Sequence, residues 1–353
     1  MNPSGRPILW KHRDTSGRDN RVEYIPANDG SYAFVGLFNS RDTRLSQTWM
    51  GMNEVGFAIM NTASYNLNTP KTASSKKDRE GYVMSLALQK CKSVDDFAHL
   101  LDSLQRPLGV EANFGVVDAA GNGAFFETNN QSYTRFDLKD SDNGVLIRTN
   151  FSEAGHPVKG KGYTRYDDAR ELLAPYIAEK AVTPEVLTEI LSRSFYSAAK
   201  GKDFSCDSIV ATTDSEFIPR SKSTASIAIE GCIPMESTDS IMPGELLDEY
   251  IMWTALGYPP CAETVPVWCR PDGVDIRLRG TLPGGKSVLC EEAYKKMNEV
   301  FFTKKGSKSR YIDMRKLFND EGIGYVQTLR RKNHYTYETT RRNNARSAAI
   351  GTE

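Results

Sequence analysis

Four short segments of the sequence place polar side chains where chemistry could be done, at the ends of predicted strands or in the first turn of a predicted helix. These segments are residues 10–15, 49–62, 147–151 and 162–166. Their carboxylate, amide, guanidinium and ammonium groups donate or accept hydrogen bonds and can stabilise charge. No GxSxG elbow, HExxH, P-loop or GxGxxG motif occurs. Four histidines disfavour a Ser-His-Asp or Cys-His enzyme, although one histidine would suffice.

Each of these side chains also has an ordinary local role. Asp14 could cap the loop that follows it, and Asn61 and Asn150 could be turn residues that tolerate a left-handed backbone. Arg165 near a helix start would usually lie at the surface, although a cation there opposes the helix dipole, which favours a function. A histidine such as His12 is more often a packed or surface residue than a catalytic one. On local sequence alone, the ordinary roles are favoured.

The four segments lie on a chain in which strand-rich and helix-rich regions alternate. Short apolar or alternating runs predict strands, and apolar residues at three- and four-residue spacing predict helices. Strands are expected at 7–11, 32–38, 47–50, 56–61, 113–118, 124–128, 144–149, 208–213, 226–230 and 265–268. Helices are expected at 79–91, from Ser93, at 163–177, from Thr183, and at 287–301 and 311–331. This order predicts one α+β domain over residues 1–353, in which helices cover sheets, with a helical tail over 309–353.

The composition is that of an ordinary globular protein. Of 353 residues, 39% are hydrophobic and 25% charged, which excludes a largely disordered chain. Lys plus Arg and Asp plus Glu number 45 each, so no overall field selects nucleic acid or an anionic membrane. A local basic excess near the C-terminus is best interpreted as a solvated helix face; it comprises Arg330, Arg331, Lys332, Arg341, Arg342 and Arg346.

The cysteines show no metal-binding pattern. None of the six forms a CxxC pair, and with four histidines no zinc spacing occurs. They could be buried thiols or form two or three disulfides. No apolar run is long enough to span a bilayer.

At the four polar segments the chain resembles a group of N-terminal-nucleophile (Ntn) hydrolases. The group includes choloylglycine hydrolases, penicillin V acylases, acid ceramidase-like enzymes and acyl-coenzyme A:6-aminopenicillanic acid acyltransferases. Its motifs are matched in order, along essentially the whole chain, by Lys11-His12-Arg13-Asp14, Gly51-Met52-Asn53-Glu54-Val55-Gly56-Phe57, Thr149-Asn150, and Tyr163-Thr164-Arg165 with Leu172-Leu173. Residues 252–260 are similar to the substrate-pocket strand region of the group.

The resemblance implies a four-layer αββα sandwich of two antiparallel sheets flanked by helices, with the active site at one end of the sheets. A first-residue Cys would be the nucleophile, and its own α-amine, with a pKa near ~7.7–8, would take the thiol proton. Asp14 would orient that amine, and Arg165 would lower the pKa of the thiol and pair with Asp14. Asn150 and Asn61 would donate hydrogen bonds to the oxyanion.

The implied reaction is hydrolysis of a linear, non-peptide C–N bond in a small-molecule N-acyl amide. The residues expected to contact the substrate are Lys11, Trp49, Trp253 and Tyr258. No cofactor, metal, nucleic acid or membrane span is expected, and a homo-oligomer is left open. Because relatives of this type are generally exported, a periplasmic or secreted location is expected.

The chain departs from the group's pattern at its start. Lys11 stands where Arg or Gln is common and His12 where Asn is common; Lys keeps the charge but loses bidentate geometry. The group's Cys would lie several residues upstream of Met1, so the extreme N-terminal strand residues are expected to be missing. Residues 1–7 are polar, lack a signal peptide and read as a truncated start. Two alternatives remain: an acyltransferase that uses the same acyl-enzyme, and a non-catalytic small-molecule binder that has lost the nucleophile.

Overall fold

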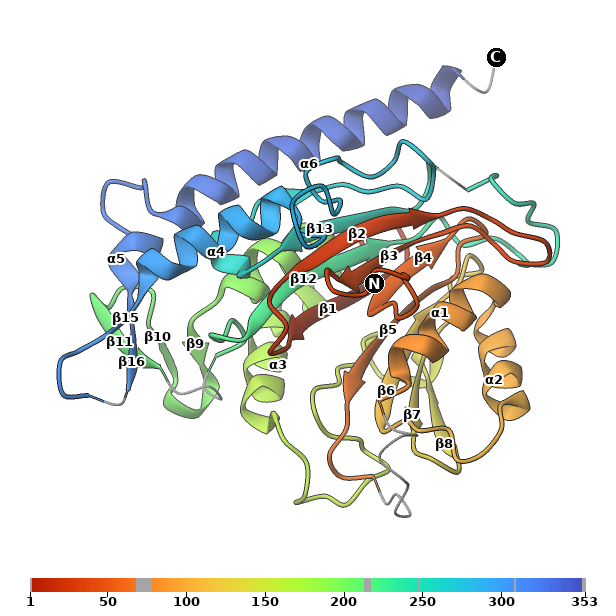
Figure 1. Cartoon of the computed structure of the whole chain (residues 1–353), viewed down its shortest axis with the longest axis horizontal. Helices are drawn as coiled ribbons and strands as arrows, with labels where there is room; N and C mark the ends of the chain where they lie inside the picture. Colours follow the sequence, from red (N-terminus) through yellow and green to blue (C-terminus); the bar gives the residue numbers. More distant parts are fainter. Residues whose placement is uncertain (1, 68–77, 213–216, 247, 308, 351–353) are drawn as a thin grey trace.

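Two antiparallel sheets lie face to face, and helices cover the outer face of each, in the computed structural model of the chain (Figure 1). The structure describes the backbone of residues 2–67, 78–212, 217–246, 248–307 and 309–350, with side chains as far as residue 344. Helix, sheet, sheet and helix therefore follow one another as layers. The α+β class and the αββα sandwich expected from the sequence are confirmed.

The larger sheet has seven strands that follow one another in chain order from β2 to β8. The strands are β2 (Asn20–Ile25), β3 (Phe34–Asn39), β4 (Met50–Asn53), β5 (Ala58–Ala63), β6 (Ala112–Val117), β7 (Gly123–Thr128) and β8 (Tyr133–Asp137). Helices α1 (Glu80–Lys90) and α2 (Val94–Ser103) cover its outer face, where Phe97 makes edge contacts with the rings of Phe114 and Phe126. Apolar burial between aromatic and aliphatic side chains holds this half of the fold together.

The smaller sheet has the order β1-β12-β13-β14, which leaves β1 at one edge. Its strands are β1 (Ile8–Asp14), β12 (Ser223–Glu230), β13 (Ile251–Leu256) and β14 (Thr264–Val265). The outer face packs against α3 (Tyr163–Ala178), the π-helical turn Val186–Ile190 and α6 (Tyr325–Ile350). Trp253 and Tyr337 meet there with ring centroids 4.1 Å apart.

Strand β1 divides its side chains between the two faces of the smaller sheet. Leu9, Lys11 and Arg13 are buried at alternate positions, and Leu9 belongs to the apolar core between the sheets. Ile8 and Trp10 belong instead to the outer cluster under α3 and α6. Because side chains alternate along a strand, His12 and Lys11 point to opposite sides.

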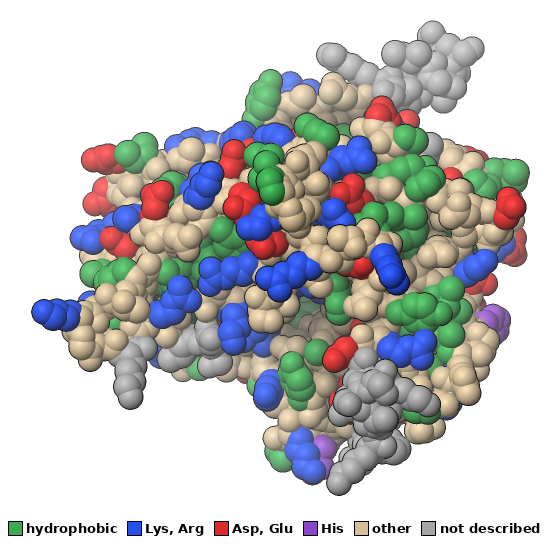
Figure 2. All heavy atoms as spheres, in the orientation of Figure 1, with side chains coloured by type: hydrophobic (Ala, Val, Ile, Leu, Met, Phe, Trp, Pro, Cys, Tyr) green, Lys and Arg blue, Asp and Glu red, His purple; other side chains and the backbone are tan. Residues whose placement is uncertain are grey.

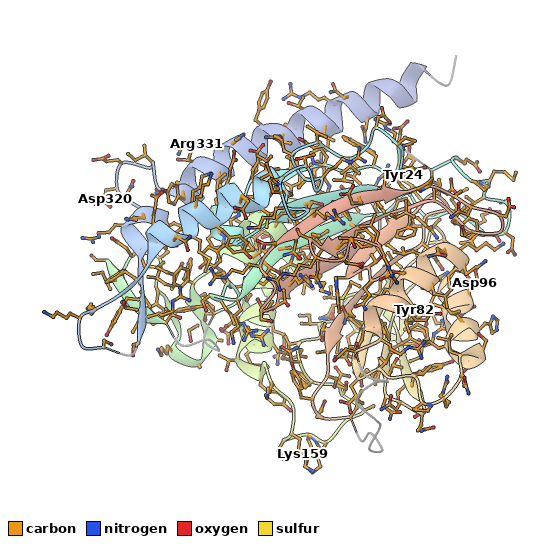
Figure 3. The ribbon with its side chains drawn as sticks, viewed as in Figure 1. Tyr24, Tyr82, Asp96, Lys159, Asp320 and Arg331 are labelled. Atoms are coloured by element: carbon orange, nitrogen blue, oxygen red, sulfur yellow. The ribbon has the colours of Figure 1, made fainter. Side chains whose placement is uncertain are left out.

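The remaining elements lie around the two sheets. They are β9 (Tyr196–Ser197), β10 (Lys202–Asp203), β11 (Ile209–Thr212), α4 (Val288–Val300), β15 (Phe301–Thr303), β16 (Arg310–Asp313), α5 (Met314–Leu317) and the short 3-10 turns η2 (Leu138–Asp140), η4 (Leu191–Arg193), η5 (Ala198–Lys200) and η6 (Pro259–Cys261). Helix α6 runs along the top of Figure 1, and Arg331 on it points outward in Figure 3. No helix in the described ranges is long and apolar enough to cross a bilayer.

Helix starts were predicted better than strands. Ser93 caps α2 as expected: its hydroxyl accepts from the Asp96 N–H at 3.0 Å, and the Asp96 carboxylate (labelled in Figure 3) accepts from the Ser93 N–H at 3.1 Å. The strand expected at 144–149 is wrong, because those residues join no ladder. The helix expected at 311–331 is wrong in its first part, since β16 pairs there with β11 and β15. Hydrogen bonding of β16 to its two neighbouring strands therefore outweighs the helical pattern of the local sequence.

The Gly-x-Asn-Glu-x-Gly run serves the fold rather than the chemistry. The Asn53 amide donates to the carbonyls of Leu88 (2.9 Å) and Cys91 (2.8 Å) at the end of α1, and its oxygen accepts from the Phe57 N–H at 2.9 Å. A Cβ on Gly51 would lie 2.4 Å from the Val35 carbonyl oxygen, so no larger residue fits. Asn53 thereby joins α1 to the turn between β4 and β5.

We expect Asn53→Ala to lower the free energy of unfolding by about 3 kcal/mol, because it leaves two carbonyls and one N–H buried without partners. Chemical denaturation followed by circular dichroism measures this loss. The exposed Asn143→Ala is the matched control and should change stability by no more than about 0.5 kcal/mol. Equal effects of the two substitutions would contradict the structural role of Asn53.

Candidate active site

The carboxylate of Asp14, at the end of β1, is the centre of a polar cluster. Its Oδ2 accepts from Arg220 at 2.8 Å (Nε) and 2.7 Å (Nη2), and its Oδ1 accepts from the Ser223 hydroxyl at 2.6 Å. The His12 ring lies beside them, with Nε2 2.8 Å from Ser223 Oγ and 4.0 Å from Asp14 Oδ1. Antiparallel pairing of β1 with β12, through an irregular register after Arg13, brings these residues together.

Arg165 and Asn150 join the same cluster from distant parts of the chain. Arg165, in the first turn of α3, lies with Nη1 3.9 Å from Asp14 Oδ2, and its Nη2 donates to Asn150 Oδ1 at 2.8 Å. Asn150 also donates from Nδ2 to the Ala63 carbonyl at 2.9 Å, at the end of β5. The structure thus brings Asp14, Asn150 and Arg165 together in one connected network.

Lys11 and Asn61 form a second group, on the other side of β1. Lys11 Nζ donates to Asn61 Oδ1 and to the Trp49 carbonyl, each at 2.7 Å. Asn61 lies in β5, two residues before the Ala63 carbonyl that Asn150 contacts, and the Thr62 hydroxyl bonds to the carbonyl of Thr149. The end of β5 therefore links the two groups.

Burial controls the charges of the site. Burial lowers the pKa of His12 to about 4; Asp14 opposes this shift, while Arg165 and Arg220 add to it. Burial also lowers the pKa of Lys11 well below its usual value, and the nearby Arg13 lowers it further. For Arg165 the largest cause of a lowered pKa is again burial, followed by Arg220. His12 is consequently a neutral imidazole at neutral pH.

The residues expected to contact a substrate are not gathered in one place. Lys11 and Trp49 lie beside Asn61, and the Trp49 ring sits 5.3 Å from the Arg13 guanidinium. Trp253 and Tyr258 are fully buried: Trp253 packs on Tyr337 under α6, and Tyr258 packs on Phe301. The interpretation of these two residues as pocket walls is not supported, because neither side chain reaches the surface.

Ser223 and Arg220 contact Asp14 but were not anticipated from the sequence. Arg220 precedes β12 and Ser223 is its first residue. Both lie more than two hundred residues after Asp14, and nothing in their local sequence marks them. Only the pairing register of β1 with β12 would reveal them. Figure 2 shows a hollow below the middle of the face, in the region of the view where Figure 1 draws β1 and α3, with basic side chains along its rim. Lys159, labelled in Figure 3, marks the loop that leads from Asn150 to α3.

The cysteines lie apart from this network and form no disulfide; all six are described, and five are buried. Burial raises the pKa of the thiols of Cys91, Cys232, Cys261, Cys269 and Cys290. Within the described residues, no three His, Cys, Asp or Glu side chains are arranged to hold a metal ion.

A family model identifies the chain's relatives. The model described as "Acyl-coenzyme A:6-aminopenicillanic acid acyl-transferase" matches residues 2–196, more than half of the sequence. The chain belongs to this family. The matched residues include Asp14, Asn61, Asn150 and Arg165, and the family relates the chain to amide hydrolases and acyltransferases of the Ntn type.

Several solved structures are similar to the chain at low identity. A variant of the conjugated bile acid hydrolase from Clostridium perfringens is 12% identical, over 72% of this chain and 87% of that one, with a TM-score of 0.42. The penicillin V acylase from Agrobacterium tumefaciens is 11% identical, over 76% and 84%, at 0.39. A Caenorhabditis elegans ortholog of N-acylethanolamine-hydrolyzing acid amidase is 10% identical, over 69% and 95%, at 0.38. No curated protein sequence matches the chain.

We expect the buried His12 to make the protein less stable in acid. Between its ordinary pKa of 6.5 and its folded value of about 4, the unfolded chain binds a proton that the folded chain does not. The free energy of unfolding therefore does not depend on His12 protonation above about pH 6.5. As the pH falls from 6.5 toward 4, His12 lowers it by at most about 3 kcal/mol. Chemical denaturation at pH 7, 6, 5 and 4 measures it.

His12→Asn should flatten this pH dependence, because an amide does not titrate. Asp14, Arg165 and Arg220, which face His12, remain in the variant, so the two proteins differ only in the His12 side chain. His99→Asn, at an exposed position, should leave the pH dependence as it is. Equal slopes for wild type and His12→Asn would refute the neutral, buried state of His12.

Proposed function

We propose that this chain is the body of a cysteine Ntn amidase that hydrolyses linear C–N amide bonds of small N-acyl amides. The nucleophilic Cys is supplied by a residue upstream of Met1, as the first residue of the mature enzyme. The observation that carries the proposal is the network in which Arg165 contacts both Asp14 and Asn150, and Asn150 bonds to the end of β5, the strand that holds Asn61.

Each member of the network suits one task in amide cleavage. Asp14 would hold and orient the α-amine that serves as base, and the nearby Arg165 guanidinium would stabilise the thiolate. Asn61 directs its oxygen to Lys11, so its amide N–H groups are left for another partner, and one Nδ2 proton of Asn150 remains beyond its bond to Ala63. These donors would stabilise the tetrahedral oxyanion.

The edge of β1 supports the place proposed for the nucleophile. The Gly231 N–H donates to the Pro7 carbonyl at 2.9 Å, so in the antiparallel pair of β1 with β12 the odd-numbered residues 9, 11 and 13 bond to β12. The backbone groups of Ile8, Trp10 and His12 point the other way, and no backbone–backbone bond from the described residues meets them. A further strand could pair there and bring an upstream Cys to the sheet end where Asp14, Asn150 and Arg165 lie.

None of the chain's own cysteines fits the role. All six lie within the chain and lack a free α-amine, and burial raises the thiol pKa of five of them, which opposes formation of the thiolate. An exported location is part of the proposal.

The test extends the protein upstream with its native segment, processed so that a Cys is the first residue. We expect amide turnover from the extended protein and none from protein that begins at Met1, assayed on a panel of N-acyl amides. Asn150→Ala in the extended protein should lower kcat about a hundredfold or more with a smaller change in KM, because an oxyanion donor acts mainly in the transition state.

Asp14→Ala should be comparably severe, since the amine would lose its orienting carboxylate. Asn143→Ala is the control for substitution of an exposed asparagine. An extended protein that binds an N-acyl amide without turning it over would favour the non-catalytic binder. Robust turnover by protein that begins at Met1 would show that the nucleophile lies elsewhere.

The family model favours acyl transfer as a second candidate function. Hydrolysis and transfer share the acyl-enzyme and differ in whether water or an amine resolves it. Adding an acceptor amine to the extended protein and measuring the ratio of new amide to free acid separates them. Predominant new amide would establish the transferase.

A further inference from the structure

Two buried polar atoms in the Asp14 cluster have no partner among the described residues. They are Nδ1 of His12, whose side chain is 8% exposed, and Nε of Arg165, whose side chain is 13% exposed. Both side chains lie beside the Asp14 carboxylate. His12 Nε2 is 4.0 Å from Oδ1, and Arg165 Nη1 is 3.9 Å from Oδ2. A buried polar atom without a partner is destabilising, and a ligand that supplied a donor to one atom and an acceptor to the other would remove that cost.

The bonds of Ser223 determine which of the two atoms is an acceptor. Its single hydroxyl proton goes to Asp14 Oδ1 at 2.6 Å, because a carboxylate only accepts. Its oxygen accepts from the Arg220 backbone N–H at 2.9 Å. The 2.8 Å contact with His12 Nε2 therefore needs the proton to be on Nε2. The neutral ring then has a bare lone pair on Nδ1.

The cluster accordingly offers one unused acceptor and one unused donor. The His12 Nδ1 lone pair can accept a hydrogen bond, and the Arg165 Nε–H can donate one. A secondary amide carries both complementary groups on adjacent atoms, an N–H and a C=O. An ester or a tertiary amide carries the oxygen but has no N–H for His12.

We propose that His12 Nδ1 binds the N–H of the substrate amide while Arg165 Nε binds a substrate oxygen, so that the site selects secondary amides over esters and tertiary amides. This inference rests on the amidase function proposed above and adds His12 to the residues that touch the substrate. An ester would set an oxygen lone pair against the lone pair of Nδ1 and leave the buried acceptor unpaired. We expect that difference to be worth about tenfold to a hundredfold in kcat/KM.

The first experiment needs no turnover and uses the protein that begins at Met1. Its four histidines are labelled with ¹⁵N and assigned by single His→Asn variants, and the ring nitrogens are observed by NMR at pH 7. We expect a proton on Nε2 of His12 and none on Nδ1. The probes are N-methylacetamide, which has an N–H, and N,N-dimethylacetamide, which has none. Only N-methylacetamide should move the Nδ1 resonance upfield.

Two outcomes of this experiment would overturn the proposal. One is a proton on His12 Nδ1 in the free protein. The other is an equal response to the two probes, including no response to either, which would leave His12 as a packing residue. Because neither outcome depends on catalysis, this test stays readable even if the amidase proposal fails.

The second experiment uses the extended enzyme and two matched substitutions. The amide of His12→Gln reaches the Nε2 position and keeps a donor for Ser223 but has no group at Nδ1, whereas His12→Asn keeps a polar group near Nδ1. We expect His12→Gln to lower the ratio of kcat/KM for N-decanoylglycine to that for its ester analogue, decanoyloxyacetate, by at least tenfold. His12→Asn should lower this ratio less. A ratio that stays the same in His12→Gln would refute the role of Nδ1 while leaving the amidase itself established.

Discussion

The rest of the site depends on the hydrogen bonds and ion pairs of the Asp14 carboxylate. The carboxylate accepts hydrogen bonds from Ser223 and Arg220 of the segment that leads into β12, and Arg165 of α3 approaches it from the outer layer. One largely buried anion therefore joins the end of β1, the segment before β12 and the first turn of α3. A buried charge is tolerated only when it is paired and hydrogen-bonded. The irregular register after Arg13, which places Asp14 opposite Ser223, is part of the same arrangement.

The alternation of β1 explains why the site has two halves. Lys11 points into the space between the sheets and meets Asn61, while His12 points to the outer side, where α3 covers the sheet. The two halves are connected at the end of β5, where Asn150 bonds to the Ala63 carbonyl and Thr62 bonds to the Thr149 carbonyl. A substrate amide at this sheet end would meet oxyanion donors from one half and charged groups from the other. The loop from Asn150 to α3 is thus a structural part of the site.

Sequence reasoning anticipated the fold class, most helix starts and the residues of the Asp14–Arg165–Asn150 network, because caps, periodicity and motif order are local or linear signals. It missed Ser223 and Arg220, whose importance comes only from the register between strands far apart in the chain. It also treated Trp253 and Tyr258 as pocket walls, although both are buried core residues. A large aromatic side chain looks the same in sequence whether it faces a cavity or a packed helix. The strand expected at 144–149 failed because its apolar residues find no neighbouring strand to pair with.

The role of Asn53 bears on how members of this family are to be compared. Its three buried bonds hold α1 to the β4–β5 turn, and they do so whether or not any reaction takes place nearby. Natural selection for a foldable chain alone would preserve Asn53 and Gly51, even in a lineage that has abandoned chemistry. A match to this run in another sequence therefore indicates a shared fold and carries no information about a shared reaction.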